Sequence, residues 1–288
     1  MAPSRHHDTG LQYLTPDAAL EDIIHLMKRN GAVMIRGLVS VTDLDQAYDE
    51  VKARLNVDRE WEGEFFPSAS SFPSLFYSPS SFLLKQRAEE TKRVNGLIGA
   101  GPAYTRTQAM NSLFQSLCTA LLTARSTFWW GDMRKESVSK PYVTAAVAIQ
   151  SGPGGKAQPL HGDSYVNHRI IASTSRPTAP DPSLILTPTL GKGEALLIFS
   201  SVMHGGGNNT TTGNYRLVYS TFAAHGYLRQ EENQFLAVPL DVVKTYDRAT
   251  QQFIGYYISE PACGHVEQMD PIYVLYPELP GEGDPRDF

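Results

Sequence analysis

The residues of this chain best suited to chemistry are His161 and Asp163, two positions apart in the stretch KAQPLHGDSY. On a β-strand, residues i and i+2 point to the same face, so this imidazole and this carboxylate would lie side by side. The chain has eight histidines, and a His-x-Asp pair arises by chance about 0.4 times in such a sequence. The pair therefore gains meaning only from other residues.

Two later residues supply that context. His204 follows the apolar run EALLIF, and Arg216 comes twelve residues after it, at the head of another strand-like run. Two imidazoles and one carboxylate form the facial triad of non-haem Fe(II) oxygenases, which leaves positions on the metal for a co-substrate and dioxygen. The planar guanidinium of Arg216 can hold the distal carboxylate of 2-oxoglutarate by two charge-assisted hydrogen bonds. Gln158 can donate its amide to the same keto acid.

Each of these residues also has an ordinary structural interpretation. A lone histidine at a strand end is more often a structural residue than a ligand. Arg216 can serve in a surface salt bridge, and Gln158 can hydrogen-bond within a turn. The glycine-rich run at 205–214 is first a tight connection between strands, and only second a source of room for a ligand. The order His-x-Asp, His, Arg favours the metal interpretation for the set.

Other catalytic classes lack their motifs. The HGGG at 204–207 is similar to the oxyanion loop of lipases, but the chain has no GxSxG pentapeptide, which disfavours a serine hydrolase. HExxH, GxGxxG and P-loop motifs are also absent from the sequence. The two cysteines, Cys118 and Cys263, form no CxxC pair, which argues against a disulfide framework and a thiolate zinc site.

The composition is that of an ordinary globular protein, with 288 residues, 41% hydrophobic, 19% charged and a formal net charge of -5. This charge gives no reason to expect nucleic acid or a membrane as a partner. The sequence starts without an apolar signal core, and its apolar runs are too short to span a bilayer. We therefore expect a cytoplasmic protein with a single domain over 1–288.

Hydrophobic periodicity predicts the elements that must position these residues. Thr15 is expected to cap the first helix and Gly31 to end it. The serine-rich stretch at 68–84 has neither a helical nor a strand period. The predicted helices cover 15–31, 42–55 and 108–124, and the predicted strands cover 32–38, 142–150, 183–187, 194–199 and 215–224.

At its motifs the chain resembles the phytanoyl-CoA dioxygenase family of Fe(II)/2-oxoglutarate enzymes, and more closely the fungal branch that tailors meroterpenoids and alkaloids. The resemblance rests on GAVMIRGLV, ETKRVNGLIG, QPLHGD and MHGGGNNTTTGNYR, and extends over most of the chain. It implies a mainly β fold with flanking helices, namely a double-stranded β-helix of the jelly-roll, cupin-like type. A helical cover with N-terminal strands would span 1–135, the barrel core 136–260, and a tail 261–288.

The resemblance also implies roles for the residues. Fe(II) would be held by His161, Asp163 and His204, and 2-oxoglutarate by Arg216 with help from Gln158. Ascorbate would serve as a reductant. The implied activity is the oxidation of a hydrophobic small molecule by hydroxylation, desaturation or rearrangement, in fungal secondary metabolism of a terpenoid or meroterpenoid kind.

Two further expectations concern the substrate pocket and the partners of the protein. Phe222, Tyr227 and Phe235 are candidates for lining a pocket, although core packing is the more frequent role for each. The expected assembly is a homodimer, or a heterodimer with a related dioxygenase.

The segment between Asp163 and His204 is short for this fold. It has 40 residues, whereas about five strands with short turns need about 45 positions or more. The sequence thus leaves open whether a strand pair is missing there. Missing strands would expose sheet edges, which a partner chain can cover. The alternative function is accordingly a catalytically weak or silent subunit that stabilises a related active dioxygenase.

Overall fold

The computed structural model describes residues 11–55, 91–167 and 185–279. The chain divides into two compact units. The first unit comprises Met1–Asp45, Leu55–Arg93 and Ile149–Val218, and the second comprises Gln46–Arg54, Val94–Ala148 and Tyr219–Phe288. The serine-rich stretch at 68–84 lies outside the described residues.

Helices and short strands alternate along the described chain. The strands are β1 (Tyr13–Leu14), β2 (Ala32–Ile35), β3 (Thr91–Val94), β4 (Ala124–Trp130), β5 (Met133–Ser139), β6 (Pro141–Ser151), β7 (Ala195–Ile198) and β8 (Arg216–His225). The α-helices are α1 (Leu20–Asn30), α2 (Val41–Leu55), α4 (Pro102–Tyr104), α5 (Ser112–Leu122), α6 (Gln234–Ala237), α7 (Leu240–Thr245), α8 (Arg248–Ile254) and α9 (Ile272–Leu275). Two 3₁₀ turns, Leu97–Gly99 and Asp163–Asn167, and a π-helical turn, Thr105–Ala109, complete them.

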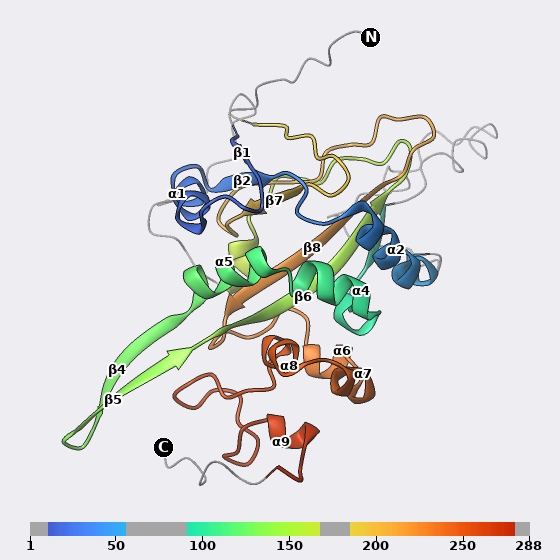
Figure 1. The fold of residues 1–288 in the computed structure, drawn as a ribbon. Helices are drawn as coiled ribbons and strands as arrows, with labels where there is room; N and C mark the ends of the chain where they lie inside the picture. Colours follow the sequence, from blue (N-terminus) through green and yellow to red (C-terminus); the bar gives the residue numbers. More distant parts are fainter. Residues whose placement is uncertain (1–10, 56–90, 168–184, 280–288) are drawn as a thin grey trace, which may run out of the picture. The chain divides into compact units, whose positions relative to one another are not determined.

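The first unit contains a three-stranded sheet of order β1-β2-β7, with α1 beside it (Figure 1). β1 runs parallel to β2, and β7 runs antiparallel to β2 with Ala32 opposite Ile198. All four residues of β2 are buried, as are Ile23, Leu26 and Met27 of α1. The apolar face of α1 therefore packs into the core of this unit.

Gly31 links α1 to β2 and to the segment that precedes His204. It ends the helix with φ 77°, a left-handed conformation that favours glycine. A Cβ added at Gly31 would lie 2.6 Å from Cγ2 of Val202, and the Gly31 carbonyl accepts a hydrogen bond from the Phe199 amide. The helix end and the chain leading to His204 are thus held in close contact.

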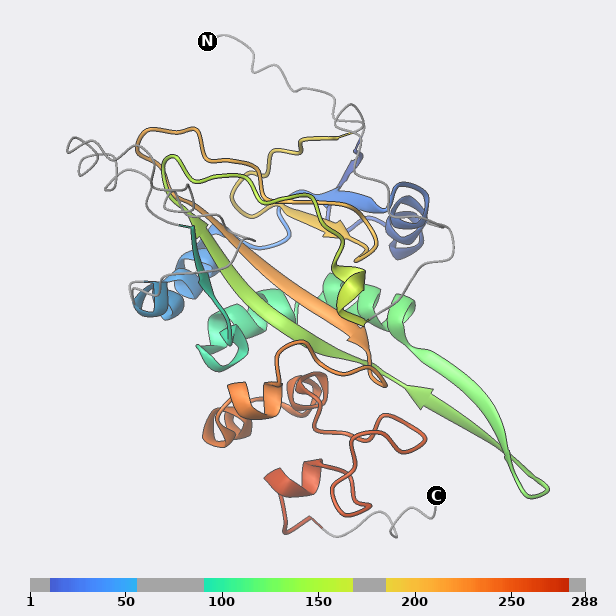
Figure 2. The ribbon, with the colours of Figure 1, turned by 180° about the vertical axis from the view of Figure 1, so that it is seen from behind.

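In the second unit, capping carboxylates and amides fix several helix starts. The Glu50 carboxylate accepts hydrogen bonds from the amides of Ala103 and Tyr104 at the start of α4. The Asn111 side chain accepts from the amides of Leu113 and Phe114 at the start of α5. β4 and β5 form an antiparallel ribbon that extends beyond α8 and α9 of the same unit (Figure 2).

A further sheet has the order β3-β6-β8. Within the described residues, the strands pair into two three-stranded sheets and one ribbon, without closing a barrel. The structure is therefore a mixture of helices and small sheets, and the double-stranded β-helix stays a prediction. The single-domain boundaries also stay a prediction, although the one proposed at 135/136 falls inside β5.

Most predicted elements are confirmed, with two errors. The first predicted helix starts at Leu20 rather than after Thr15, because Thr15 and Ala18 close a separate turn through a 3.1 Å backbone hydrogen bond. The predicted strand at 183–187 is wrong for its described part, since Ile185–Leu190 has no regular structure and Ile185 and Leu186 are exposed. Among the described residues, we find no helix long and apolar enough to cross a membrane.

Candidate functional site

The predicted ligands meet where two segments of the first unit run side by side without regular strands. Residues 154–164 face residues 200–209 through backbone hydrogen bonds. These bonds link Gly154 and Gly155 to Asn209, Gln158 to Gly206, His161 to His204, and Ser164 to Ser200, with N···O distances of 2.8 to 2.9 Å. The pairing holds the two histidines directly opposite each other.

His161 and His204 form an isolated antiparallel bridge with amide–carbonyl distances of 2.9 and 2.8 Å. Their ring centroids lie 4.6 Å apart. Asp163 begins a 3₁₀ turn, so the side-by-side placement of His161 and Asp163 does not come from strand alternation, as the sequence reasoning assumed. A turn brings the carboxylate between the two rings instead.

The three side chains present one ligand atom each within 4.8 Å of one another. Nε2 of His161 lies 3.6 Å from Oδ1 of Asp163, and Nε2 of His204 lies 3.4 Å from Oδ2. At metal–nitrogen distances of about 2.1 Å, ligand atoms at right angles lie about 3.0 Å apart, so small side-chain rotations would close this cluster on an ion. All three side chains are largely buried, at 15 to 27% exposure.

Backbone carbonyls orient both imidazoles. Nδ1 of His161 lies 2.8 Å from the carbonyl oxygen of Pro159, and Nδ1 of His204 lies 2.9 Å from that of Val202. A carbonyl only accepts, so each Nδ1 carries a proton, and in the neutral imidazole the lone pair then lies on Nε2, the nitrogen that faces Asp163. This second layer of hydrogen bonds is typical of histidines that ligate metals. Sequence reasoning missed both carbonyls.

The predicted co-substrate residues lie around Gly206 in the same unit. The Gly206 amide donates to Oε1 of Gln158 at 2.8 Å, and Nη2 of Arg216 donates to the carbonyl oxygen of Gly207 at 2.7 Å. A Cβ on Gly206 would lie 2.9 Å from Oε1 of Gln158 and 3.7 Å from Nη2 of Arg216. Gly206 therefore leaves a small space bounded by both side chains.

Arg216 stands at the first position of β8, as predicted. Within the described part of the chain it forms no ion pair, and partial burial lowers the pKa of its guanidinium from the ordinary value. A cation that has lost part of its water without gaining a carboxylate favours an anionic ligand. Gln158 likewise keeps its Nε2 without an acceptor among the described residues.

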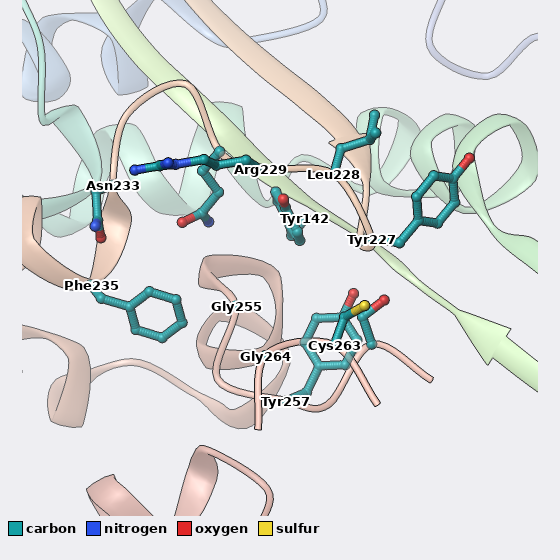
Figure 3. A pocket seen from close by; sticks show the side chains of 13 residues that line it. Tyr142, Tyr227, Leu228, Arg229, Asn233, Phe235, Gly255, Tyr257, Cys263 and Gly264 are labelled. Atoms are coloured by element: carbon teal, nitrogen blue, oxygen red, sulfur yellow. The ribbon is translucent and has the colours of Figure 1, made fainter. Parts of the chain in front are cut away.

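The three pocket candidates have separate outcomes. Tyr227 and Phe235 line a cavity of about 370 Å³ in the second unit, together with Tyr142 and Tyr257 (Figure 3). Both are more than 40% exposed, so the core packing favoured from the sequence is wrong for them. Burial raises the pKa of Tyr142 to about 12, which keeps its hydroxyl protonated. Phe222 lies in β8 and is not among the residues lining this cavity.

In chemical terms, the first unit contains a cluster of two histidines and one carboxylate suited to a divalent first-row metal.

No protein-family model matches the chain. The chain is 24% identical to dioxygenase peniF of Penicillium patulum, over 89% of each protein, and 25% identical to dioxygenase cnsJ of Penicillium expansum, over 94% of this chain and 86% of that one. The chain is thus similar to fungal dioxygenases over most of its length.

A solved structure is also similar, that of the non-haem α-ketoglutarate-dependent epimerase SnoN from nogalamycin biosynthesis. The TM-score is 0.49 at 14% identity, over 76% of this chain and 89% of that one. The finer resemblance to the phytanoyl-CoA dioxygenase family stays a prediction.

Proposed function

We propose that this protein is an Fe(II)- and 2-oxoglutarate-dependent dioxygenase that oxidises a hydrophobic small molecule. The observation that carries the proposal is the convergence of Nε2 of His161, Nε2 of His204 and the Asp163 carboxylate within 4.8 Å. Its similarity to fungal dioxygenases along most of the chain supports the same reaction class. Fe(II) bound there would supply dioxygen activation coupled to decarboxylation of 2-oxoglutarate.

The chain's own residues would prepare this chemistry. The carbonyls of Pro159 and Val202 hold the two imidazoles in the tautomer that presents Nε2, so little reorganisation is needed when the ion binds. Asp163 supplies the negative charge that partly balances a divalent cation. The low exposure of all three side chains limits the access of water to the site.

Arg216 and Gln158 would hold the co-substrate. The guanidinium can give one carboxylate two parallel hydrogen bonds while keeping its bond to Gly207. The free donor of Gln158 can reach an oxygen of the same keto acid, and the missing side chain at Gly206 leaves room between them. This arrangement suits a small dicarboxylate, and ascorbate would serve to keep the iron reduced.

The test measures iron first and turnover second. Purified protein incubated anaerobically with Fe(II) is expected to hold about one iron per chain, and Asp163→Ala is expected to hold none while keeping its circular dichroism spectrum. His25→Ala is the matched control, because His25 is an exposed histidine of α1 in the same unit. With 2-oxoglutarate, ascorbate and oxygen, the unaltered protein should form succinate slowly even without its substrate. Equal iron content in the Asp163→Ala variant would refute the metal assignment.

The same measurements distinguish an active enzyme from the alternative, a catalytically silent subunit. That alternative expects no iron in the isolated chain, and activity only after co-expression with a related dioxygenase. The complete set of ligand atoms favours the enzyme. The proposed substrate is a hydrophobic molecule of the terpenoid kind, carbon-rich and uncharged. It is tested by screening such compounds for stimulation of succinate formation.

A further inference from the structure

We infer that the outer edge of β4 is a self-association surface, where two copies of this chain join their β4–β5 ribbons into one four-stranded sheet. The strand ARSTFWW runs antiparallel to β5, from Ala124 opposite Ser139 to Trp130 opposite Met133. Within the described residues, neither strand of this ribbon pairs with any other strand. A strand edge that carries unpaired amides and carbonyls is a template for another chain.

The turn of the ribbon determines which backbone groups face that edge. Gly131 and Asp132 form a two-residue turn, with Gly131 at φ 60°. In such a hairpin the closing pair, Trp130 and Met133, is joined by backbone hydrogen bonds. Along the ladder, hydrogen-bonded pairs alternate with pairs whose amides and carbonyls point outward. The amides and carbonyls of Arg125, Thr127 and Trp129 therefore point away from β5, toward the open edge.

The opposite edge, on β5, is protected. The amide of Val138 donates to the Glu260 carboxylate at 2.7 Å, so one outward donor there is already used. Arg134 and Glu136 flank the remaining edge as a 3.3 Å ion pair. Charged side chains on an edge strand oppose pairing with another chain. By contrast, β4 offers one cation and three aromatic residues, so β4 is the edge open to a partner.

A two-fold pairing of β4 with itself fits these groups in one register. Centred on Thr127, it places Thr127 opposite Thr127 and Arg125 opposite Trp129 of the second copy, so outward-pointing groups meet outward-pointing groups. It is also the register that pairs all seven residues of the strand. Each Arg125 guanidinium then faces an indole that is 67% exposed in the single chain, giving two cation–π contacts and no opposed like charges.

The exposed apolar area indicates a reversible dimer. Trp129 is 67% and Trp130 37% exposed. At about 250 Å² for a whole tryptophan, the four tryptophans of a dimer expose about 500 Å², of which edge pairing would bury a part. Together with the strand backbones, the contact would stay below about 1,200 Å², the range of weak and transient interfaces. A bilayer is a poorer occupant, because its hydrocarbon cannot satisfy the open amides and carbonyls.

The test compares proline variants on the two edges by sedimentation velocity, over about 1 to 100 µM protein, a range suited to a small interface. The unaltered chain is expected to shift from monomer toward dimer. Thr127→Pro removes an amide that points outward, so the ribbon should persist while the dimer weakens at least about tenfold. Glu136→Pro is the matched control on the β5 edge and should leave the dimer unchanged.

A cross-link gives a second readout that does not depend on proline. Opposed hydrogen-bonded residues have Cα atoms about 5.5 Å apart, within the range of disulfides. In a Cys263→Ser background, Thr127→Cys is therefore expected to oxidise to a covalent dimer, and Glu136→Cys is not. The proposal would be overturned if the unaltered chain stayed monomeric at every concentration, or if both proline variants weakened the dimer equally. It would also be overturned if the chain bound phosphatidylcholine vesicles and Thr127→Pro left that binding intact.

Discussion

Replacing Arg216 with glutamine should raise the 2-oxoglutarate concentration that half-saturates succinate formation, while leaving iron content unchanged. In the structure, Arg216 gives one hydrogen bond to Gly207 and has no acidic partner among the described residues, so its remaining donors can bind a carboxylate. Hydrogen bonds to a charged group contribute about 1.5 to 3 kcal/mol, and each 1.4 kcal/mol is about tenfold in affinity. The expected increase in KM is therefore about 10- to 150-fold.

The assay is a 2-oxoglutarate titration of succinate formation at saturating Fe(II) and oxygen. Arg216→Lys should fall between the unaltered protein and Arg216→Gln, because lysine keeps the charge but loses the planar fork. Arg36→Gln is the matched control, since Arg36 is exposed in the same unit and lies 4.0 Å from Glu194. An unchanged KM for 2-oxoglutarate in Arg216→Gln, with normal iron content, would show that Arg216 does not bind the co-substrate.

Two further predictions concern Gly206 and the start of α8. Gly206→Ala would place a Cβ 2.9 Å from Oε1 of Gln158, so we expect a KM for 2-oxoglutarate raised about five-fold through a disturbed hydrogen bond, whereas Gly207→Ala, with nothing within 4 Å of its Cβ, should change little. Asp247→Ala removes the side chain that accepts from the Thr250 amide at 2.8 Å and should lower the free energy of unfolding by about 1 kcal/mol at pH 7 in urea titrations. The backbone hydrogen bond from Thr250 lowers the pKa of Asp247. The contribution of Asp247 to the free energy of unfolding is therefore present above the ordinary carboxyl pKa and lost as the pH falls through the pKa of the folded state. If the two proteins still differed by the same free energy of unfolding at acid pH, this assignment would be contradicted.

Local sequence signals predicted the ends of elements well where a single residue determines the backbone conformation. Gly31 ends α1 in a left-handed conformation that its lack of a side chain permits, as expected from the sequence. The predicted start of the same helix was wrong, although Thr15 is a good capping residue. A hydrogen bond from Thr15 instead lowers the pKa of the Asp17 carboxyl. As a cap, the Thr15 hydroxyl would accept a hydrogen bond from a helix amide, whereas toward Asp17 it donates one, and propensity alone does not choose between these two roles.

The site was predictable in its residue types and not in its geometry. The order His161, Asp163, His204, Arg216 can be read from the sequence because side-chain chemistry is specific. The groups that orient the rings, the carbonyls of Pro159 and Val202, are backbone atoms that every residue has. Their place depends on the bridge between His161 and His204. A sequence carries no local signal for such long-range pairing.

That bridge also answers the concern about the short segment between Asp163 and His204. Counting strands suggested that 40 residues were too few to bring the third ligand back. Loop-closure entropy depends only weakly on length, and a change from about 45 to about 40 residues alters its free-energy cost by only about 0.1 kcal/mol. Two short segments paired through backbone hydrogen bonds from Gly154 to Ser164 can therefore place His204 beside Asp163. Chain length in this segment thus limits how much sheet surrounds the ligands, rather than whether they meet.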